Sequence, residues 1–436
     1  MWSHRFFLCL ILMMGLGARI ALALLQPSDL TSDNDGYLAH ARPIAEGRGF
    51  LGPYSDRPTA FRPPGYPMAI ASLLAVGVMD PVAVMLINTL ASAAIIWLSR
   101  ILGLRAGLSE KFAMLAALFV AIDPLLVRYS VLPMTEVPCA AVLLAAIVLL
   151  RRAVDSETAS TISLRVASGM LFGIGALMRP VVLISCAFVC GYAVMTTLTN
   201  KATGKSYVRL VLHALLPAVA AGLVLMPWVI RNAVHFQAFV PATTHGGYTL
   251  ALGNNADFYR DVISGQDVFP WDGSALDVWQ QRMIAQSKQD GVRQDDERAL
   301  DAWYYEKATA AIKADPLSFL KATCLRLNRF WAITTAESTG PGWVSSGTSV
   351  WYALLWLGLL MERFGAWRLR KTVGGIRVVD LWLVVLSFML MHSVYWTDAR
   401  MRAPLMPVLV VLSLCGWQYA VVAVLRFGRK HERSLT

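Results

Sequence analysis

Two aspartates in a short polar stretch are the first residues of this chain whose types and spacing could do chemistry. Asp33 and Asp35 are separated by one residue in the stretch 32–37, which follows an apolar run over 6–25. From one turn, both carboxylates could approach one cation or one reacting hydroxyl. A carboxylate within hydrogen-bond reach of a hydroxyl can act as a general base. The alternative is that these residues only cap a helix that begins near Gly36.

A third acidic residue stands at the start of a later apolar run. Glu136, in the stretch Pro133-Met134-Thr135-Glu136, opens the run 134–150. An acid in the first turn of a helix is stabilised by the helix dipole, which is a structural interpretation. An acid at membrane depth is also a candidate for function. Both interpretations stay open, and Asp33, Asp35 and Glu136 are the candidate catalytic residues.

Several arginines fall at the same ends of the apolar runs as these acids. They are Arg62, Arg179, Arg231, Arg400 and Arg402. Guanidinium groups bind phosphate through two parallel hydrogen bonds and stay charged when partly buried. Arg62 begins the turn 62–67, Arg-Pro-Pro-Gly-Tyr-Pro, which could equally be a rigid corner at the lipid headgroups. Together the five arginines would suit the phosphate of an anionic lipid headgroup.

Four further polar or aromatic residues are candidates for substrate binding. They are Tyr37, Tyr66, His245 and Asn254. His245 precedes Gly246-Gly247, where the backbone could approach a ligand closely. Asp33, Asp35 and His245 could together hold a divalent cation, although a single histidine is usually an ordinary loop residue. The sequence indicates no other cofactor.

The composition indicates a membrane protein with many spans. Of 436 residues, 56% are hydrophobic and 15% are charged, whereas a soluble domain carries about a quarter. The net charge of +11 comes from basic residues between the apolar runs, so it reports topology rather than a nucleic-acid partner. The six cysteines show neither a disulfide framework nor zinc-ligand spacing.

Ten apolar runs are predicted as transmembrane helices. They lie near 6–25, 81–102, 111–127, 134–150, 166–179, 180–198, 208–229, 346–362, 378–396 and 403–425. The apolar stretch 65–78 is short and framed by prolines. Counting it as a span would invert every later basic loop, so we interpret it as an interfacial or re-entrant helix.

The predicted fold is therefore all-α and polytopic, with juxtamembrane helices on the outer side. Residues 1–229 would form a transmembrane catalytic module that includes a first periplasmic loop, 26–80. Residues 230–345 would form a small, mostly helical periplasmic segment, with an amphipathic helix around 295–315. Residues 346–436 would supply the last transmembrane helices and a basic cytoplasmic tail.

The order of these motifs resembles the C-type (GT-C fold) glycosyltransferase superfamily. Within it, the chain is most similar to the bacterial protein-mannosyltransferase-like branch. This branch includes the aminoarabinose transferases that act on lipid A. The matching motifs are Asp33-x-x-x-Tyr37, the turn 62–67, Thr135-Glu136, Gly175–Pro180, Pro227-Trp228-x-x-Arg231-Asn232 and Arg400-x-Arg402-x-Pro404.

The resemblance implies an inverting transfer of sugar from a polyprenyl-phosphate donor. The acceptor would be a lipid, glycan or protein hydroxyl at the periplasmic face of the bacterial inner membrane. Asp33 matches the catalytic aspartate of the family and would take the acceptor's proton, whereas Asp35 has no clear counterpart. Arg400 and Arg402 resemble the arginines that hold the lipid phosphate. Some relatives place an acidic metal ligand before the Gly-Tyr turn, but 58–67 contains no acid.

Two other classes of function fit the same sequence. One is a transporter or flippase for a lipid-linked glycan, and the other is a glycan polymerase or ligase. Transporters often show internal repeats and broken helices at the membrane midplane. Here we find no repeat, and the candidate charges gather on one side, which favours the transferase.

Overall fold

The computed structural model describes residues 4–53, 55–155, 160–199, 205–265, 271, 273–334, 342–369 and 378–435. Within these residues the chain is helical and contains no named strand, only an isolated bridge between Leu51 and Pro58. The predicted all-α fold is therefore confirmed.

The first half of the chain supplies ten α-helices and one short 3₁₀ helix. They are α1 (His4–Leu25), η1 (Pro27–Thr31), α2 (Tyr37–Ala45), α3 (Gly65–Leu74), α4 (Asp80–Ala106), α5 (Glu110–Ile122), α6 (Pro124–Tyr129), α7 (Glu136–Val154), α8 (Ser160–Ala176), α9 (Val181–Thr199) and α10 (Lys205–Phe236).

The second half begins with short helices and returns to long ones. They are α11 (Gly246–Gly253), α12 (Ala256–Phe258), the π-helical η2 (Tyr259–Ile263), α13 (Gly273–Gln289), α14 (Glu297–Ala314), α15 (Pro316–Phe330), α16 (Gly342–Leu369), α17 (Val379–Val394), the 3₁₀ helix η3 (Ala399–Leu405) and α18 (Met406–Leu435). The amphipathic helix predicted around 295–315 is α14.

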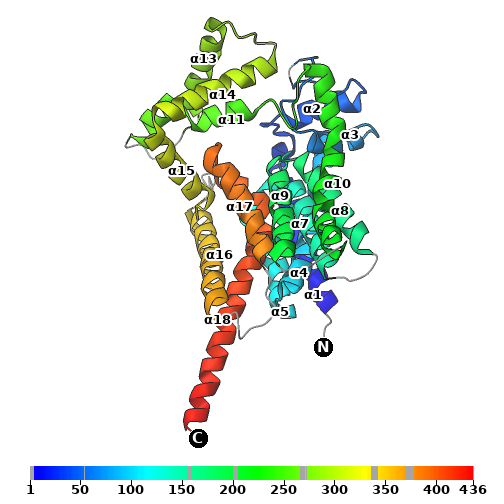
Figure 1. Cartoon of the computed structure of the whole chain (residues 1–436), viewed down its shortest axis with the longest axis vertical. Coiled ribbons are helices and arrows are strands. Elements are labelled where there is room, and N and C mark those ends of the chain that lie inside the picture. The colour runs from blue at the N-terminus through cyan, green and yellow to red at the C-terminus, as the bar shows by residue number, and fades with distance from the viewer. Residues whose placement is uncertain are drawn as a thin grey trace.

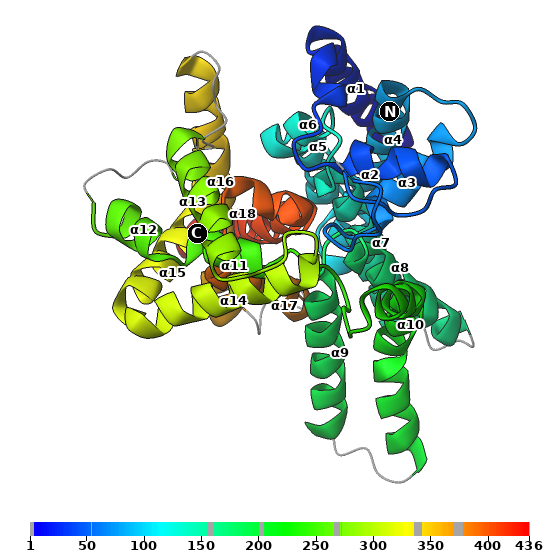
Figure 2. The same cartoon turned by 90° about the horizontal axis from the view of Figure 1, so that it is seen from above.

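The long helices run side by side, and the short ones cover one end of the bundle (Figure 1). We call the end that carries α2, α3 and α11–α14 the upper side, and the end with both termini the lower side. Seen from above, α1–α10 form one half and α11–α18 the other (Figure 2). The two halves meet where α17 packs beside α9.

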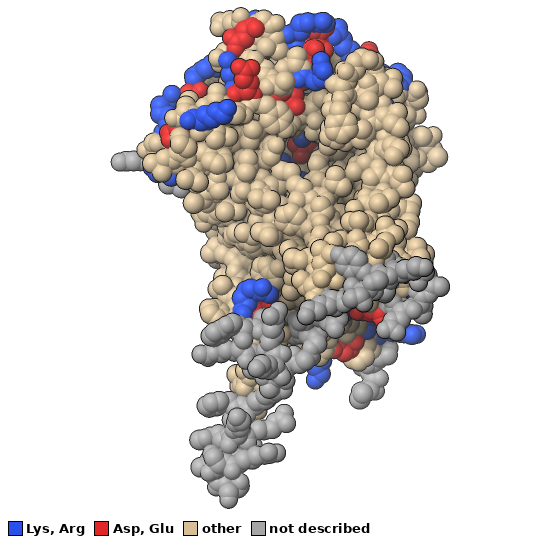
Figure 3. Space-filling model, in the orientation of Figure 1, with Lys and Arg blue, Asp and Glu red and all other residues tan. Residues whose placement is uncertain are grey.

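Within the described residues, seven helical segments are long and apolar enough to cross a membrane. They are His4–Leu25, Asp80–Ala106, Glu136–Val154, Val181–Thr199, Leu210–Phe236, Val344–Gly365 and Ala399–Leu425. The face in Figure 3 agrees with this, because its charged side chains gather near the upper and lower ends and leave a broad uncharged band between them.

Three of the ten predicted spans are shorter helices. The run 111–127 is broken at Asp123-Pro124 into α5 and α6, because a proline cannot donate the backbone hydrogen bond that would continue the helix. The runs 166–179 and 378–396 correspond to α8 and α17, of 17 and 16 residues. The stretch predicted not to span, 65–78, holds the ten-residue α3, which at 1.5 Å per residue is about 15 Å long.

The start of α3 is fixed against the connection between α8 and α9. The amide of Gly65 donates to the carbonyl of Leu177 at 2.8 Å, and a Cβ at Gly65 would lie 2.9 Å from that carbonyl. Glycine is required for this close approach. The contact brings the proline-rich turn that carries Arg62 beside the connection that carries Arg179.

The upper segment has an apolar core of its own. Trp271, Trp279 and Trp303 are buried in it together with Phe258 and Tyr304. These rings hold α11–α15 together as a packed unit.

Candidate active site

Five charged side chains from five separate elements converge at the upper ends of the long helices. Asp35 precedes α2, Arg62 lies in the turn before α3, and Glu136 is the first residue of α7. Arg179 lies between α8 and α9, and Arg400 lies in η3. We call Asp35, Arg62, Glu136, Arg179 and Arg400 the arginine–carboxylate cluster. Four of its members come from the first 229 residues, and Arg400 comes from the C-terminal part.

The two carboxylates of the cluster are each shared between arginines. Arg62 Nη2 lies 3.0 Å from Asp35 Oδ1, and Arg400 Nη1 lies 3.3 Å from Asp35 Oδ2. Arg179 Nη2 donates to Glu136 Oε1 at 2.6 Å, and Arg400 Nε is 3.8 Å from the same oxygen. Arg400 therefore connects the two pairs.

The cluster is largely shielded from water. The Glu136 side chain is 1% exposed, that of Arg179 14% and that of Asp35 19%. Burial by itself would raise the pKa of Asp35, but the positive charges of Arg400 and Arg62 outweigh it and hold this pKa below its ordinary value. Glu136 Oε2 is buried and has no hydrogen-bond partner among the described residues. The cluster thus holds a buried acceptor that no described residue satisfies.

His245 lies beside the cluster as a neutral imidazole. Its ring centroid is 4.2 Å from that of Phe61 and 4.9 Å from that of Tyr248. Desolvation, together with the charge of Arg62, lowers the pKa of His245 to about 3. Its Nδ1 is buried without a hydrogen-bond partner in the described part of the chain, so the ring has hydrogen-bonding capacity to offer a ligand.

The glycines after His245 serve packing. The amide of Gly247 donates to Asp301 Oδ1 of α14 at 2.6 Å, and a Cβ at Gly247 would overlap the carbonyl of Asp301. Close approach is therefore required there, but to α14 rather than to a ligand.

Asp33 lies differently from Asp35. Its Oδ1 accepts from the amide of Leu38 at 3.0 Å and its Oδ2 from that of Ala39 at 2.8 Å. This is the helix-capping arrangement that the sequence left open, and it fixes the carboxylate at the start of α2. The carboxylate that the arginines hold is that of Asp35.

Tyr37 and Tyr66 lie under the cluster and are buried. Their rings meet edge to face with centroids 5.5 Å apart, and the guanidinium of Arg62 lies 5.8 Å from the ring of Tyr37. The hydroxyl of Tyr66 is 3.5 Å from Asn88 Oδ1 of α4. Tyr37 therefore contacts Arg62 directly, and Tyr66 packs against Tyr37.

Two of the predicted phosphate-binding arginines lie outside the cluster. Arg231 donates to the carbonyls of Thr59 at 2.6 Å and Phe50 at 2.8 Å, so it fastens the loop before α3. Arg402 is fully buried and donates to the carbonyl of Phe330 at 2.6 Å, with its guanidinium 4.5 Å from the Tyr352 ring.

Asn254 is also elsewhere. Its Nδ2 donates to the carbonyl of Val394 at 2.9 Å, and its Oδ1 accepts from Arg326 at 3.2 Å. It joins α11 to the end of α17. No three His, Cys, Asp or Glu side chains among the described residues are grouped as metal ligands, so Asp33, Asp35 and His245 do not form the trio that the sequence suggested.

One residue that positions the site was missed by sequence reasoning. Glu297, at the start of α14, accepts from the hydroxyl of Thr59 at 2.6 Å and from the amide of Ala60 at 2.7 Å. It holds the loop that leads into Phe61 and Arg62. Its position at the start of an amphipathic helix indicates helix capping, but the sequence does not indicate a hydrogen bond with Ala60, 237 residues away.

A cavity of about 850 Å³ adjoins the site on the upper side. Its lining includes Arg57, Phe61, Phe236, Arg293 and Glu297. Phe61 is shared between the cavity and the ring stack of His245. In Figure 3 a recess below the upper rim shows acidic and basic atoms inside the otherwise uncharged band.

Comparison with known proteins followed from this geometry. The family model for dolichyl-phosphate-mannose-protein mannosyltransferases matches residues 61–228. The archaeal oligosaccharyltransferase AglB from Archaeoglobus fulgidus, in complex with an inhibitory peptide and a dolichol-phosphate, superimposes with a TM-score of 0.57 at 14% identity. The match covers 99% of this chain and 52% of that one. The chain has a GT-C fold.

Two further structures of the same oligosaccharyltransferase agree with this GT-C assignment. The apo form matches with a TM-score of 0.56 at 15% identity, covering 99% of this chain and 52% of that one. The form tethered to an acceptor peptide with the NVT sequon has a TM-score of 0.58 at 14% identity, covering 99% and 51%. The chain thus spans about half the length of the structures it matches. No curated protein sequence matches it.

The family match contains three members of the cluster, Arg62, Glu136 and Arg179. Asp35, Arg400 and His245 lie outside it, and the fold brings them to the same place. The cluster therefore combines residues from inside and outside the matched region.

Proposed function

We propose that this protein is an inverting glycosyltransferase that moves a sugar from a polyprenyl-phosphate donor to a hydroxyl group. The observation that carries the proposal is the arginine–carboxylate cluster. Three guanidinium groups from separate elements surround two shielded carboxylates at the ends of membrane helices. This is where the phosphate of a lipid carrier lies when its chain is in the membrane.

The donor phosphate would bind to Arg62, Arg179 and Arg400. Each of these arginines already holds an oxyanion, and a phosphate offers more acceptor oxygens in the same geometry. When the bond from the anomeric carbon to phosphate breaks, negative charge grows on the phosphate oxygens. Guanidinium groups fixed in advance stabilise that charge more in the transition state than in the bound donor.

The acceptor hydroxyl would enter from the upper cavity that Phe61 lines. We assign the general base to Asp33, as the family resemblance implies. Arg400 and Arg62 hold the pKa of Asp35 below its ordinary value, which makes this carboxylate a poor proton acceptor. The carboxylate of Asp33 takes the hydroxyl proton, the oxygen attacks the anomeric carbon, and the bonding electrons leave with the phosphate. Attack opposite the leaving group inverts the anomeric centre.

The charge distribution supports a periplasmic site in a bacterial inner membrane. Arg100, Arg105, Arg151 and Arg152 lie at the lower ends of α4 and α7, and short basic connections stay in the cytoplasm. The upper side, with the cluster, would then face the periplasm. A glycolipid, glycan or protein hydroxyl could reach the site there.

The proposal is tested by sugar transfer in purified protein. The protein, reconstituted in nanodiscs, is incubated with polyprenyl-phosphate-linked hexoses or aminopentoses and extracted envelope glycolipid. Removal of a general base costs roughly 10²–10⁴-fold in rate, so Asp33→Asn should lose that much kcat with little change in donor KM. Asp56→Asn is the matched control, since Asp56 is a solvent-exposed carboxylate of the same loop.

Two results would contradict the assignment. Full activity of Asp33→Asn would remove this residue as the base. Movement of the lipid-linked sugar across a liposome membrane, with no covalent transfer to any acceptor, would replace the transferase with a transporter.

A further inference from the structure

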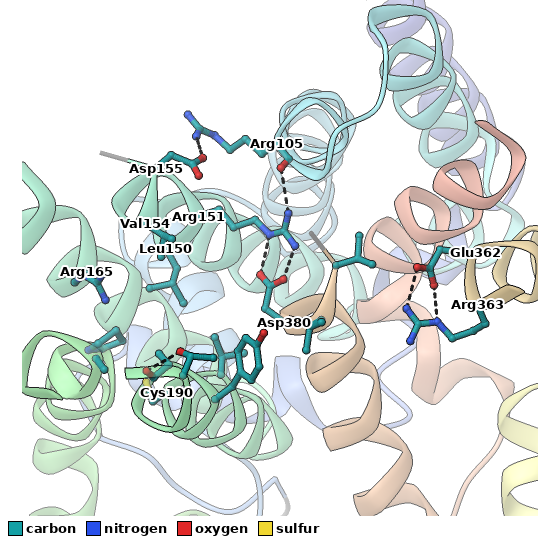
Figure 4. Close-up of a pocket in the computed structure, with 18 of the residues that line it drawn as sticks. Arg105, Leu150, Arg151, Val154, Asp155, Arg165, Cys190, Glu362, Arg363 and Asp380 are labelled. Carbon is teal, nitrogen blue, oxygen red and sulfur yellow. Dashed lines mark hydrogen bonds and ion pairs between the residues drawn. The ribbon is translucent and has the colours of Figure 1, made fainter. Parts of the chain in front are cut away.

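A second cavity lies at the lower side of the molecule, far along the helices from the cluster. It has a volume of about 850 Å³. Its lining residues come from α4, α7, α8, α9, α10, α16, α17 and α18, so it lies where the two halves of the bundle meet (Figure 4). We call it the lower cavity.

The charged side chains of the lower cavity are mostly closed into pairs. Arg105 Nη1 donates to Asp155 at 2.7 Å, and Arg151 Nε donates to Asp380 at 2.8 Å. Arg363 donates to both oxygens of Glu362, at 2.6 Å and 2.9 Å. Each of the three acids therefore has an arginine of its own, as the dashed lines in Figure 4 show.

Arg165 is the fourth arginine of this cavity, and no carboxylate of the described residues pairs with it. Its Nη1 donates to the backbone carbonyl of His213 at 3.2 Å. Its Nε is buried and has no hydrogen-bond partner within the described ranges. With four arginines and three acids, the lining contributed by the described residues carries one unbalanced positive charge.

The remaining lining is apolar. Leu150 and Val154 of α7, Val189 of α9 and Pro217 of α10 contribute to it. These residues belong to three helices that are long and apolar enough to cross a membrane. A ligand that fits both the unbalanced charge at Arg165 and the apolar lining has one negative charge on a compact polar group, and long apolar chains.

We propose that the lower cavity binds an anionic phospholipid of the adjacent leaflet. Its phosphodiester would accept hydrogen bonds from Arg165, and its acyl chains would lie against α7, α9 and α10. One phosphodiester carries the single negative charge that balances the lining. Basic pockets between transmembrane helices on the cytoplasmic side are suited to lipid headgroups of this kind.

Such a lipid would act as a connector between the two halves of the protein. It would contact α7–α10 on one side and α16–α18 on the other, and α17 leads directly into η3, which carries Arg400. This site involves none of the residues of the proposed reaction, so it can be tested whether or not the chain transfers sugar.

The experiment measures lipid binding and thermal stability in detergent-purified, delipidated protein. Phosphatidylglycerol is titrated into the full chain, and bound lipid is counted by native mass spectrometry while the melting temperature is recorded. We expect a saturable melting shift. Arg165→Gln should weaken phosphatidylglycerol binding by roughly tenfold, the scale of one charged hydrogen bond.

Matched variants separate this site from general lipid contact. Arg5→Gln removes an exposed arginine of the lower side outside the cavity and should leave binding unchanged. Ala193→Trp should fill the cavity and abolish binding with the charge of Arg165 intact. If Arg165→Gln fails to fold, Ala193→Trp carries the test.

Three outcomes would overturn the proposal. Phosphatidylcholine could stabilise the protein as well as phosphatidylglycerol, which would show that charge is not recognised. Glycerol phosphate without acyl chains could give the same shift, which would indicate a site for free phosphate. Equal binding by Ala193→Trp and the unmodified protein would place the lipid outside the cavity.

Discussion

The two arginine-rich regions of this molecule use similar side chains in opposite ways. In the upper cluster, Arg62 and Arg400 share Asp35, while Arg400 also approaches Glu136, the partner of Arg179. In the lower cavity each carboxylate has one arginine, as in the pair of Arg151 and Asp380. The upper region is a connected network, and the lower one is a set of closed pairs.

This difference decides what each region can bind. Where two arginines share a carboxylate, the phosphate of a ligand can replace the carboxylate at one arginine while the other arginine keeps its contact. No arginine is then left without an anionic partner. Where a pair is closed and buried, removing one partner is strongly destabilising, by about 3–5 kcal/mol, because it strands a charge. An exchangeable network suits a substrate that comes and goes, and closed pairs suit structure.

The largest expected effect comes from breaking the network at its connecting residue. Arg400→Gln should lower kcat by roughly 10²–10³-fold, the cost of removing one preorganised donor to a developing oxyanion. Arg105→Gln opens a partly exposed pair of the lower cavity and should leave kcat within about threefold, because it lies far from the reacting phosphate. Initial rates with a polyprenyl-phosphate sugar compare the two. Equal losses would mean that both regions act through stability alone.

A smaller effect, of opposite sign, should follow when Asp35 is neutralised. Its carboxylate competes with the donor phosphate for Arg62 and Arg400. Asp35→Asn should therefore bind free polyprenyl phosphate more tightly, by up to about tenfold, which corresponds to about 1.4 kcal/mol. Product inhibition measures this affinity. Asp155→Asn, in a closed pair of the lower cavity, should leave it unchanged. Weaker binding by Asp35→Asn would show that Asp35 holds the arginines in place rather than competing for them.

The sequence predicted the fold better than it predicted membership of the site. Apolar runs and loop charges identified the helices, including the non-spanning α3, because both signals are local. The same signals did not predict that the run 111–127 would be broken at Asp123-Pro124 into α5 and α6. A proline next to an acidic residue is also compatible with the start of a transmembrane helix.

The site depended on distances that spacing alone does not determine. Arg400 and Arg402 are two residues apart, yet one joins the cluster and the other is buried against Tyr352, because η3 turns them to different sides. Asp33 and Asp35 are separated in the same way by the start of α2. Glu297 acts through a contact with Thr59 that only the tertiary fold creates.

The smallest effect concerns His245, whose imidazole stays neutral in the folded protein at pH values where the unfolded chain protonates it. Its folded pKa of about 3 lies below the ordinary 6.5, with Arg62 and Asp35 as the charges that face it. Between pH 6.5 and about pH 3, the imidazole is protonated in the unfolded chain and neutral in the folded chain. The contribution of His245 to the free energy of unfolding is therefore complete above pH 6.5 and declines as the pH falls toward 3. The depressed pKa of Asp35 acts only at still lower pH, below its ordinary 3.8.

The melting temperature of the unmodified protein should thus fall between about pH 7 and about pH 5, and His245→Gln should reduce that fall. His4→Gln is the matched control, since its side chain is 67% exposed and should keep the full difference. An equal fall in all three proteins would mean that His245 takes up its proton in the folded state. The imidazole would then be a cation beside Arg62, and the upper cluster would carry one more positive charge for the donor phosphate than the neutral ring allows.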